Sequence, residues 1–167
     1  MQIPQRRSQK DRKPIEGPVY LTKEGIRKLE EKLRRLKHQR PALTEDLSVA
    51  LQKGDLSENA EYQDARAKLS RTDTQILITE DKLRRVVEIP PPDPSRGVTI
   101  GSTVVVLVDG VQRSYQILGS DESDPALGKI SHQSPLGSAL MGKKLDEEVT
   151  MTSASGKEKT YRIIALS

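Results

Sequence analysis

Two carboxylates three residues apart, Asp55 and Glu58, are the side chains in this sequence best placed to do chemistry. They belong to an acidic stretch, residues 45–64, in which six acids face the single base Lys53: Glu45, Asp46, Asp55, Glu58, Glu61 and Asp64. Carboxylates repel phosphates, so this stretch is not expected to bind a nucleic acid backbone directly. One or two carboxylates can hold Mg²⁺ together with waters and substrate phosphates. The pair therefore predicts a weak cation site that another molecule must complete.

The same spacing also has a purely structural interpretation. Asp-x-x-Glu forms a capping box, in which Asp55 accepts from the first amides of a helix and Glu58 reaches back to the cap. Spacing alone favours the cap over the metal site, although one pair can serve both roles. Position favours a functional role, because the pair lies between two long periodic segments.

Apolar residues recur at alternating steps of three and four on both sides of Gly54. The first series is interrupted only at Arg40, and it comprises Ile26, Leu29, Leu33, Leu36, Leu43, Leu47 and Ala50. The second comprises Tyr62, Ala65, Leu69, Thr72, Ile76, Thr79, Leu83 and Val86. Such alternation forms a heptad seam, the apolar stripe along which one helix packs against another in a coiled coil. The two seams predict equal helices over 22–53 and 57–88, with Thr22 as the first cap and a bend or loosened turn at Pro41.

Two equal heptad helices joined by a very short break should pair as an antiparallel coiled-coil hairpin. The hairpin domain is predicted over residues 19–89, with its tip at 54–58. The short break also favours pairing within one chain, since the local partner has a high effective concentration. We therefore expect a monomer, the alternative being a structural coiled coil that dimerises.

The hairpin is flanked by segments of different character. Residues 1–18 form a basic tail without periodicity, which is expected to be disordered. Residues 90–97 are rich in proline and predict a stiff linker. Residues 98–167 predict a small α+β domain with a twisted antiparallel sheet. Its elements are strands at 103–108 and 111–118 around an Asp-Gly turn, a short strand at 129–132, a helix from Ser134-Pro135 to Gly142, and a final hairpin at 148–153 and 160–166.

Composition excludes several classes of protein. There is no Cys, so disulfides and thiolate chemistry are impossible, and the two His are too few for a His-rich metal site. Hydrophobic residues make up 34% of the chain, and no apolar run is long enough to span a membrane. No secretory signal follows the basic start. A soluble cytoplasmic protein without membrane contacts is therefore expected.

The motifs resemble those of the GreA/GreB family of bacterial transcript cleavage factors. Residues 54–62, Gly-Asp-Leu-Ser-Glu-Asn-Ala-Glu-Tyr, are similar to the signature at that family's coiled-coil tip. Residues 21–25 resemble the family's opening, and Arg40-Pro41 matches as well. In the second domain, residues 117–124 and 130–143 are similar to the family pattern. The resemblance covers about residues 19–166, and its motifs occur in the family's order.

The resemblance implies a mechanism. Family members insert the coiled coil through the secondary channel of bacterial RNA polymerase and stimulate Mg²⁺-dependent cleavage of backtracked RNA 3′ ends, which rescues arrested complexes. Asp55 and Glu58 would be the catalytic and metal-directed acids, sharing Mg²⁺ with the polymerase and holding none stably alone. The second domain would have an FKBP-like fold and dock on the polymerase outside the channel.

The resemblance also assigns supporting residues. Gly54, Ser57, Asn59 and Tyr62 would shape the tip, although Tyr62 also fits a plain seam position. Arg66 matches a basic family position that faces RNA. Lys68 and Arg71 flank the tip with it, and all three are expected to steer RNA.

Other functions remain open at this stage. The first is a secondary-channel binder of the same architecture that inhibits the polymerase without stimulating cleavage; intact Asp55 and Glu58 argue against it. The second is a prolyl isomerase, but residues 98–167 offer only Tyr115 and Tyr161 as aromatic walls for a proline ring. We also expect no intrinsic nuclease, because two carboxylates cannot hold two metals alone. The protein is thus predicted to be a stimulating factor rather than an enzyme.

Overall fold

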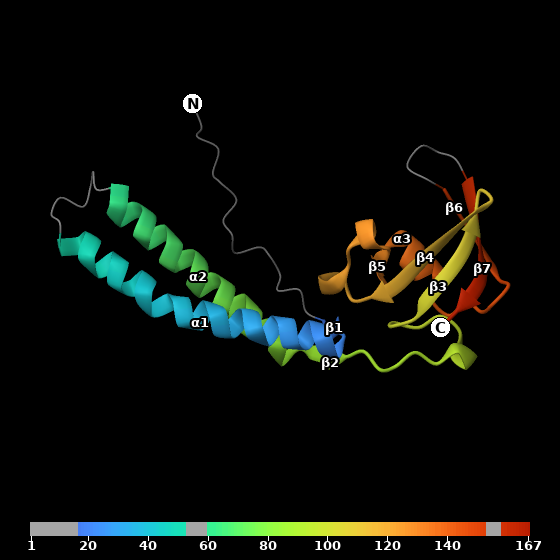
Figure 1. The fold of residues 1–167 in the computed structure, drawn as a ribbon, viewed down its shortest axis with the longest axis horizontal. Coiled ribbons are helices and arrows are strands. Elements are labelled where there is room, and N and C mark those ends of the chain that lie inside the picture. The colour runs from blue at the N-terminus through green and yellow to red at the C-terminus, as the bar shows by residue number, and fades with distance from the viewer. Residues whose placement is uncertain (1–16, 53–59, 153–157) are drawn as a thin grey trace, which may run out of the picture.

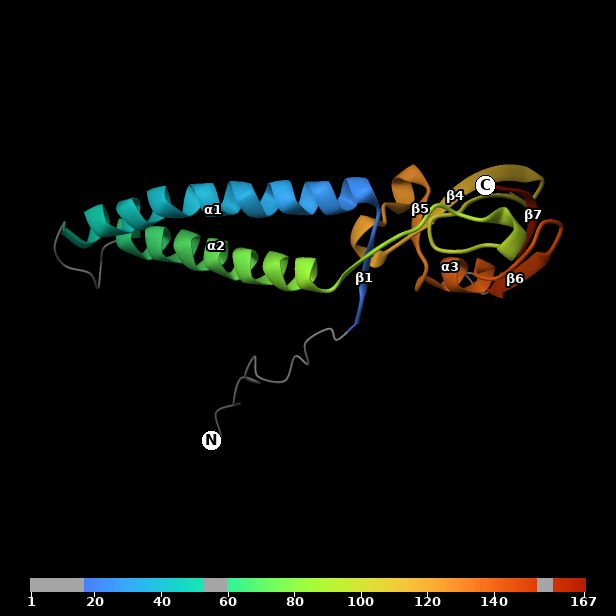
Figure 2. The ribbon, with the colours of Figure 1, turned by 90° about the horizontal axis from the view of Figure 1, so that it is seen from below.

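The computed structural model describes residues 17–52, 60–152 and 158–167, so most of the predicted basic tail lies outside the described residues. Helices α1 (Lys23–Gln52) and α2 (Ala60–Arg84) lie side by side in opposite directions and form a long hairpin (Figure 1). A small sheet domain lies beyond one end of this hairpin (Figure 2). The predicted helical hairpin and the α+β fold class are therefore confirmed.

The heptad seams account for the packing of the two helices. Every predicted seam residue is buried or half-buried. The most enclosed are Leu36 and Ala50 on α1 and Ala65, Ile76 and Thr79 on α2. The Thr79 side chain, in a residue only 2% exposed, donates a hydrogen bond to the Gln75 carbonyl over 2.7 Å. The seam thus tolerates a threonine, because the helix backbone satisfies its hydroxyl group.

The interrupted position of the first seam is filled by a polar contact. Arg40 Nε donates to a carboxylate oxygen of Asp73 on α2 over 2.7 Å. The next residue, Pro41, lies on the exposed side of α1, and the helix continues through it without a break. A proline on the exposed side displaces no seam residue, so the two helices remain paired along this stretch.

The second helix is shorter than its seam predicted. We expected it to reach residue 88, but α2 ends at Arg84 and Val86–Glu88 forms strand β2. This strand pairs in parallel with β1 (Val19–Leu21), with Val19 opposite Val86 and Leu21 opposite Glu88. The prediction was wrong here because heptad steps do not distinguish a last helical turn from a short strand, and β-branched Val86 and Val87 favour the strand.

The second domain contains a five-stranded sheet in the order β5-β4-β3-β7-β6. The strands are β3 (Thr103–Val108), β4 (Val111–Leu118), β5 (Lys129–Ser131), β6 (Glu148–Thr152) and β7 (Glu158–Leu166). At the turn between β3 and β4, Asp109 and Gly110 have φ angles of 51° and 76°, as a two-residue hairpin turn requires. The predicted antiparallel sheet is confirmed for β3, β4, β6 and β7, but it is wrong at one edge, because β5 runs parallel to β4.

The parallel edge results from the loop between β4 and β5, which carries the chain back before β5 begins. Within this loop lie two short 3-10 helices, η3 (Ser120–Glu122) and η4 (Pro125–Leu127). The Pro-rich linker contains a third, η2 (Pro94–Arg96), which Asp93 caps. These turns are too short to show as periodicity in the sequence.

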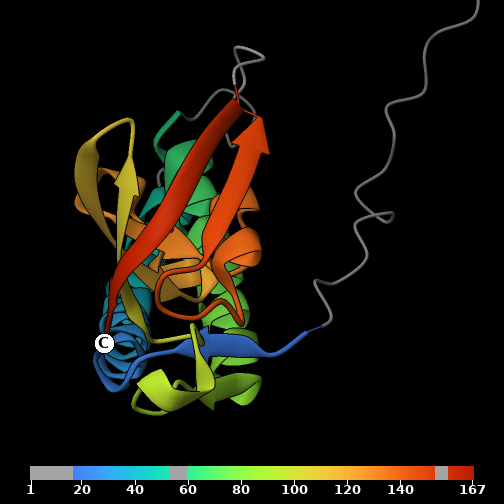
Figure 3. The same ribbon diagram turned by 90° about the vertical axis from the view of Figure 1, so that its right-hand side faces the viewer.

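Helix α3 (Pro135–Leu140) begins where predicted, since the Ser134 hydroxyl accepts from the Gly137 amide. It ends at Leu140 with Met141 as its C-cap, and Gly142 follows with a φ angle of 74°, so the predicted closing glycine is confirmed. The core of the domain lies between α3 and the sheet, and its fully buried members include Val98, Val104, Val106, Ile117, Leu140 and Ile163. Figure 3, which looks along the length of the molecule, shows how strongly the strands twist in front of the hairpin.

Candidate functional site

The candidate site lies at the end of the hairpin remote from the sheet domain. Helix α1 ends at Gln52 and α2 begins at Ala60, both at this end (Figure 1). The connecting residues 53–59 lie outside the described residues, and five predicted site residues are among them: Gly54, Asp55, Ser57, Glu58 and Asn59. Their assigned roles therefore remain predictions.

The described residues next to this end form an acidic surface. Asp46 on α1 and Glu61 and Asp64 on α2 are exposed. All three line a shallow cavity of about 370 Å³ between the helices, with the buried alanines Ala50 and Ala65 among its other walls. No cluster of three or more acids or histidines that could hold a metal occurs within residues 17–52, 60–152 and 158–167. The described surface thus supplies negative charge but not a complete cation site.

Tyr62 and the three predicted RNA-facing residues all lie on the first turns of α2. Tyr62 is half-buried, which agrees with its seam position. Arg66, Lys68 and Arg71 are exposed. At about 100° per residue, Lys68 and Arg71 lie about 60° apart around the helix, whereas Arg66 and Lys68 point to nearly opposite sides. The three bases therefore do not form one continuous face.

Of these three bases, Lys68 is already paired. Its Nζ lies 2.7 Å from Asp64, one helical turn away. The hydrogen bond and the charge of Asp64 raise the pKa of Lys68 above its ordinary value. Because both side chains are more than half exposed, the pair is easily exchanged for another anion. Lys68 therefore has a partner on its own helix, whereas its charge remains at the exposed surface.

Residues 23–40 of α1 carry eight Lys and Arg residues, some of which are paired with acids. Lys37 lies 2.7 Å from Glu80 across the two helices, and this contact lowers the pKa of Glu80. Lys28 pairs within α1 with Glu24, and the hydrogen bond that it donates lowers the Glu24 pKa. Part of the basic charge of residues 23–40 is therefore paired with acids at the exposed surface of the hairpin, where such pairs contribute little to stability.

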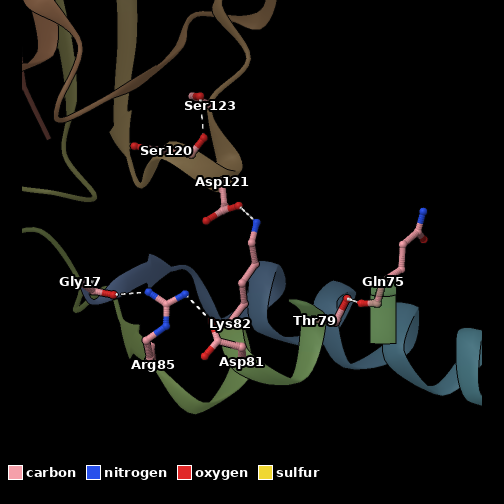
Figure 4. A network of polar contacts seen from close by, with 9 residues as sticks. All are labelled: Gly17, Gln75, Thr79, Asp81, Lys82, Arg85, Ser120, Asp121 and Ser123. Carbon is pink, nitrogen blue, oxygen red and sulfur yellow. Dashed lines mark hydrogen bonds and ion pairs between the residues drawn. The ribbon is translucent and has the colours of Figure 1, made fainter. Parts of the chain in front are cut away.

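A second set of polar contacts joins the hairpin to the sheet domain, and the sequence did not reveal it. Thr22 caps α1 as predicted, accepting from the Gly25 amide over 3.0 Å. Its own amide and hydroxyl donate to the two carboxylate oxygens of Glu122, each over 2.7 Å. Lys82 of α2 forms an ion pair with Asp121, the neighbour of Glu122 in η3 (Figure 4). The one available signal was Gly25, which stands where a capping box has Glu or Gln.

The helices of the described residues do not include one that is long and apolar enough to cross a lipid bilayer. This finding concerns α1 and α2 in particular, because both carry charge along their length.

Comparison with known proteins identifies the family. A family model for the N-terminal domain of transcription elongation factors matches residues 19–87, and one described as "Transcription elongation factor, GreA/GreB, C-term" matches residues 93–167. The chain is 40% identical over 150 residues to transcription elongation factor GreA of Bacillus subtilis, covering 88% of this chain and 95% of that protein. It is 42% identical over 147 residues to GreA of Staphylococcus aureus, covering 86% and 93%.

Among solved structures, GreA factor homolog 1 of Thermus thermophilus matches with 26% identity and a TM-score of 0.43, covering 90% of this chain and 99% of that one. The two family models together span the hairpin and the sheet domain, and the identity to the Bacillus and Staphylococcus proteins extends over both. The chain belongs to the GreA/GreB family of transcription elongation factors.

Proposed function

We propose that this protein stimulates the Mg²⁺-dependent cleavage of backtracked RNA by bacterial RNA polymerase in the cytoplasm. The hairpin enters the secondary channel of the polymerase, and Asp55 and Glu58 act at the active site. The observation that carries the proposal is the position of the Asp55-x-x-Glu58 motif, in the seven residues that connect Gln52 to Ala60. This is the end of a 30-residue helix, about 45 Å from the sheet domain.

The donor set fits a shared Mg²⁺ rather than one that is bound independently. Two carboxylates, with waters and phosphate oxygens, are common ligands for Mg²⁺. The exposed acids on the adjoining ends of α1 and α2, namely Asp46, Glu61 and Asp64, favour the approach of a cation. When bound, the ion would supply activation of the attacking water. Asp55 and Glu58 would bind and orient that water and the ion, and the polymerase would supply the remaining ligands.

The protein itself is then not an enzyme but a factor that completes the active site of another. Its helical hairpin carries Asp55 and Glu58 into the channel, and its sheet domain remains outside. Arg66 and Arg71 lie beside the tip and would attract the extruded RNA, whose phosphates the tip acids repel. This arrangement separates RNA attraction from metal binding, because Arg66 lies nearly two helical turns, and Arg71 about three turns, beyond the first residue of α2.

The decisive experiment measures RNA cleavage in a stalled, backtracked polymerase complex with Mg²⁺. The variants are Asp55→Asn and Glu58→Gln. Asn is as good a helix cap as Asp, and a capping box accepts Gln in place of Glu. Both substitutions therefore keep the cap while they remove the charge that a metal needs. The matched control is Glu45→Gln, because Glu45 is an exposed carboxylate on α1 about two helical turns before the last residue of that helix.

We expect Asp55→Asn and Glu58→Gln each to slow cleavage on the order of 10- to 100-fold, as for groups that orient a metal or its water. Binding to the polymerase and cleavage by Glu45→Gln should be unchanged. Cleavage that survives both substitutions would reduce the motif to a helix cap. Tight binding by the wild type without any cleavage would instead favour an inhibitory secondary-channel factor. RNA cleavage without polymerase would contradict the view that the protein is not an enzyme.

A further inference from the structure

We propose that Glu122 is a positioning residue, which sets the direction of the hairpin by completing the helix cap of α1 from the other domain. In a capping box, the first residue caps the helix and the residue three positions later returns a side chain to the cap amide. Here Thr22 caps the Gly25 amide over 3.0 Å, but Gly25 has no side chain to return. Glu122, 100 residues away, takes that role and accepts from the Thr22 amide over 2.7 Å.

The geometry around Gly25 fits this role. Gly25 is buried, and a methyl group added there would overlap the Glu122 carboxylate. The second carboxylate oxygen of Glu122 accepts from the Thr22 hydroxyl over 2.7 Å, so both oxygens are used on one residue. A carboxylate at a helix N-terminus is also favoured by the helix dipole. Glu122 therefore binds the start of α1 both by directed hydrogen bonds and by charge.

The same turn also holds the other helix. Asp121, next to Glu122 in η3, forms an ion pair with Lys82, which reaches out from the last turns of α2 (Figure 4). Beside η3, Gly119 is buried against the Tyr20 carbonyl so closely that a methyl group would not fit. The Tyr20 and His132 rings meet edge to face, with centroids 5.4 Å apart. One short loop thus contacts the base of both helices.

Direction matters because the hairpin is long. A 30-residue helix extends about 45 Å, so a 10° rotation at its base moves the far end by about 8 Å. Displacements of about 1 Å can cost roughly 100-fold in a reaction that depends on orientation. A contact that restricts rotation at the base therefore increases the share of molecules whose tip can reach its target. For its functional consequence, this inference rests on the proposed function.

The direction of the hairpin can be measured without polymerase. The chain has no Cys, so Gln75→Cys on α2 and Gln112→Cys on β4 introduce unique, exposed sites for spin labels. Electron–electron distance measurements on the free protein then report how widely the two domains vary in orientation. We expect one narrow distribution for the wild type and a broad one for Glu122→Ala. Glu148→Ala, an exposed carboxylate of the same domain, is the control and should remain narrow.

Two further variants separate positioning from folding. Glu122→Gln can still accept from the Thr22 amide and donate to its hydroxyl, and it should restore the narrow distribution. Gly25→Ala retains Glu122 but displaces its carboxylate, and it should broaden the distribution as Glu122→Ala does. Alanine is a better helix former than glycine, and this gain offsets part of the lost cap, so Gly25→Ala should lower the melting temperature of the hairpin less than Glu122→Ala does.

In the cleavage assay, a smaller share of correctly directed hairpins raises the concentration needed for half-maximal stimulation and leaves the maximal rate unchanged. We expect a rise of roughly fivefold for Glu122→Ala, which is typical of coupling between two sites, and none for Glu122→Gln. A narrow distribution in Glu122→Ala would overturn the inference, and so would a distribution in Glu122→Gln as broad as that of Glu122→Ala. If the wild type fails to stimulate cleavage, the proposed function fails, while the distance measurement still decides the role of Glu122.

Discussion

Arg40 on α1 and Asp73 on α2 form a hydrogen-bonded ion pair of 2.7 Å at the one position where the first heptad seam lacks an apolar residue. A second guanidinium nitrogen lies 3.5 Å from the other carboxylate oxygen, so the contact is nearly two-pronged. The bond and the charge of Asp73 raise the pKa of Arg40. The pair joins the helices midway along the hairpin, where a leucine would otherwise be expected.

Exchange of the two charges tests this pair. Arg40→Asp and Asp73→Arg should each lower the thermal stability of the hairpin, because each places like charges opposite one another. The double variant should recover part of the loss. Both groups are exposed, so we expect a small coupling. The matched control combines Arg35→Asp with Asp73→Arg, which has the same net charge. If this control recovers as much thermal stability relative to Asp73→Arg as the exchanged pair does, only net charge matters.

Thr79 offers a test of seam packing with two opposite substitutions. Its hydroxyl group bonds to the Gln75 carbonyl within the same helix, a contact that slightly disfavours helix geometry. Thr79→Val keeps the shape and should raise the melting temperature. Thr79→Ser removes a buried methyl group and should cost about 1 kcal/mol of unfolding free energy. Circular dichroism melts of the intact chain measure both, and a loss in Thr79→Val would show that the hydroxyl is needed.

The Lys37–Glu80 contact predicts a specific acid sensitivity. The folded-state pKa of Glu80 is lowered from 4.5 by the hydrogen bond from Lys37. A lowered carboxyl pKa contributes stability above the unfolded value, and this contribution is lost as the pH falls through the folded value. Lys37→Gln should therefore destabilise the hairpin at pH 7 but have little effect near pH 3. The difference in melting temperature between variant and wild type measures this at each pH.

The control for this pH dependence is Arg35→Gln, which also removes one positive charge from α1. It should change stability far less at pH 7, and its effect should vary less with pH. An effect of Lys37→Gln that is equal at pH 7 and pH 3 would contradict the assignment, because it would show that lost packing of the lysine stem dominates.

The bases beside the tip should differ in importance for cleavage. Arg66→Ala and Arg71→Ala should weaken stimulation more than Lys68→Ala, because Lys68 is already paired with Asp64. These effects should diminish as salt increases, since screening weakens steering by exposed charges. Cleavage rates at low and moderate salt test this, with Arg34→Ala on the remote half of α1 as the control. A larger loss in Lys68→Ala would show that RNA displaces Asp64.

Periodicity in the sequence was sufficient to predict the hairpin. Residues at heptad spacing must face a partner helix. Because the break between the two seams is short, the partner of each predicted helix is the other one. Turn chemistry was equally local: Asp109-Gly110 and Ser134-Pro135 were recognisable because each determines its own backbone geometry. The Asp55-x-x-Glu58 motif was also readable, since both residues lie in one short segment.

Only the tertiary structure revealed the contacts between distant segments. The pairing of β1 with β2 joins residues 19–21 to 86–88, and no local pattern marks that partnership. Glu122 accepts from Thr22 across 100 residues, and the sequence showed only a glycine at the position where a capping box has Glu or Gln. Such contacts depend on where folding places two segments in space. The sequence by itself therefore determined the elements and the carboxylate motif, whereas the tertiary structure decided how the hairpin is attached to its domain.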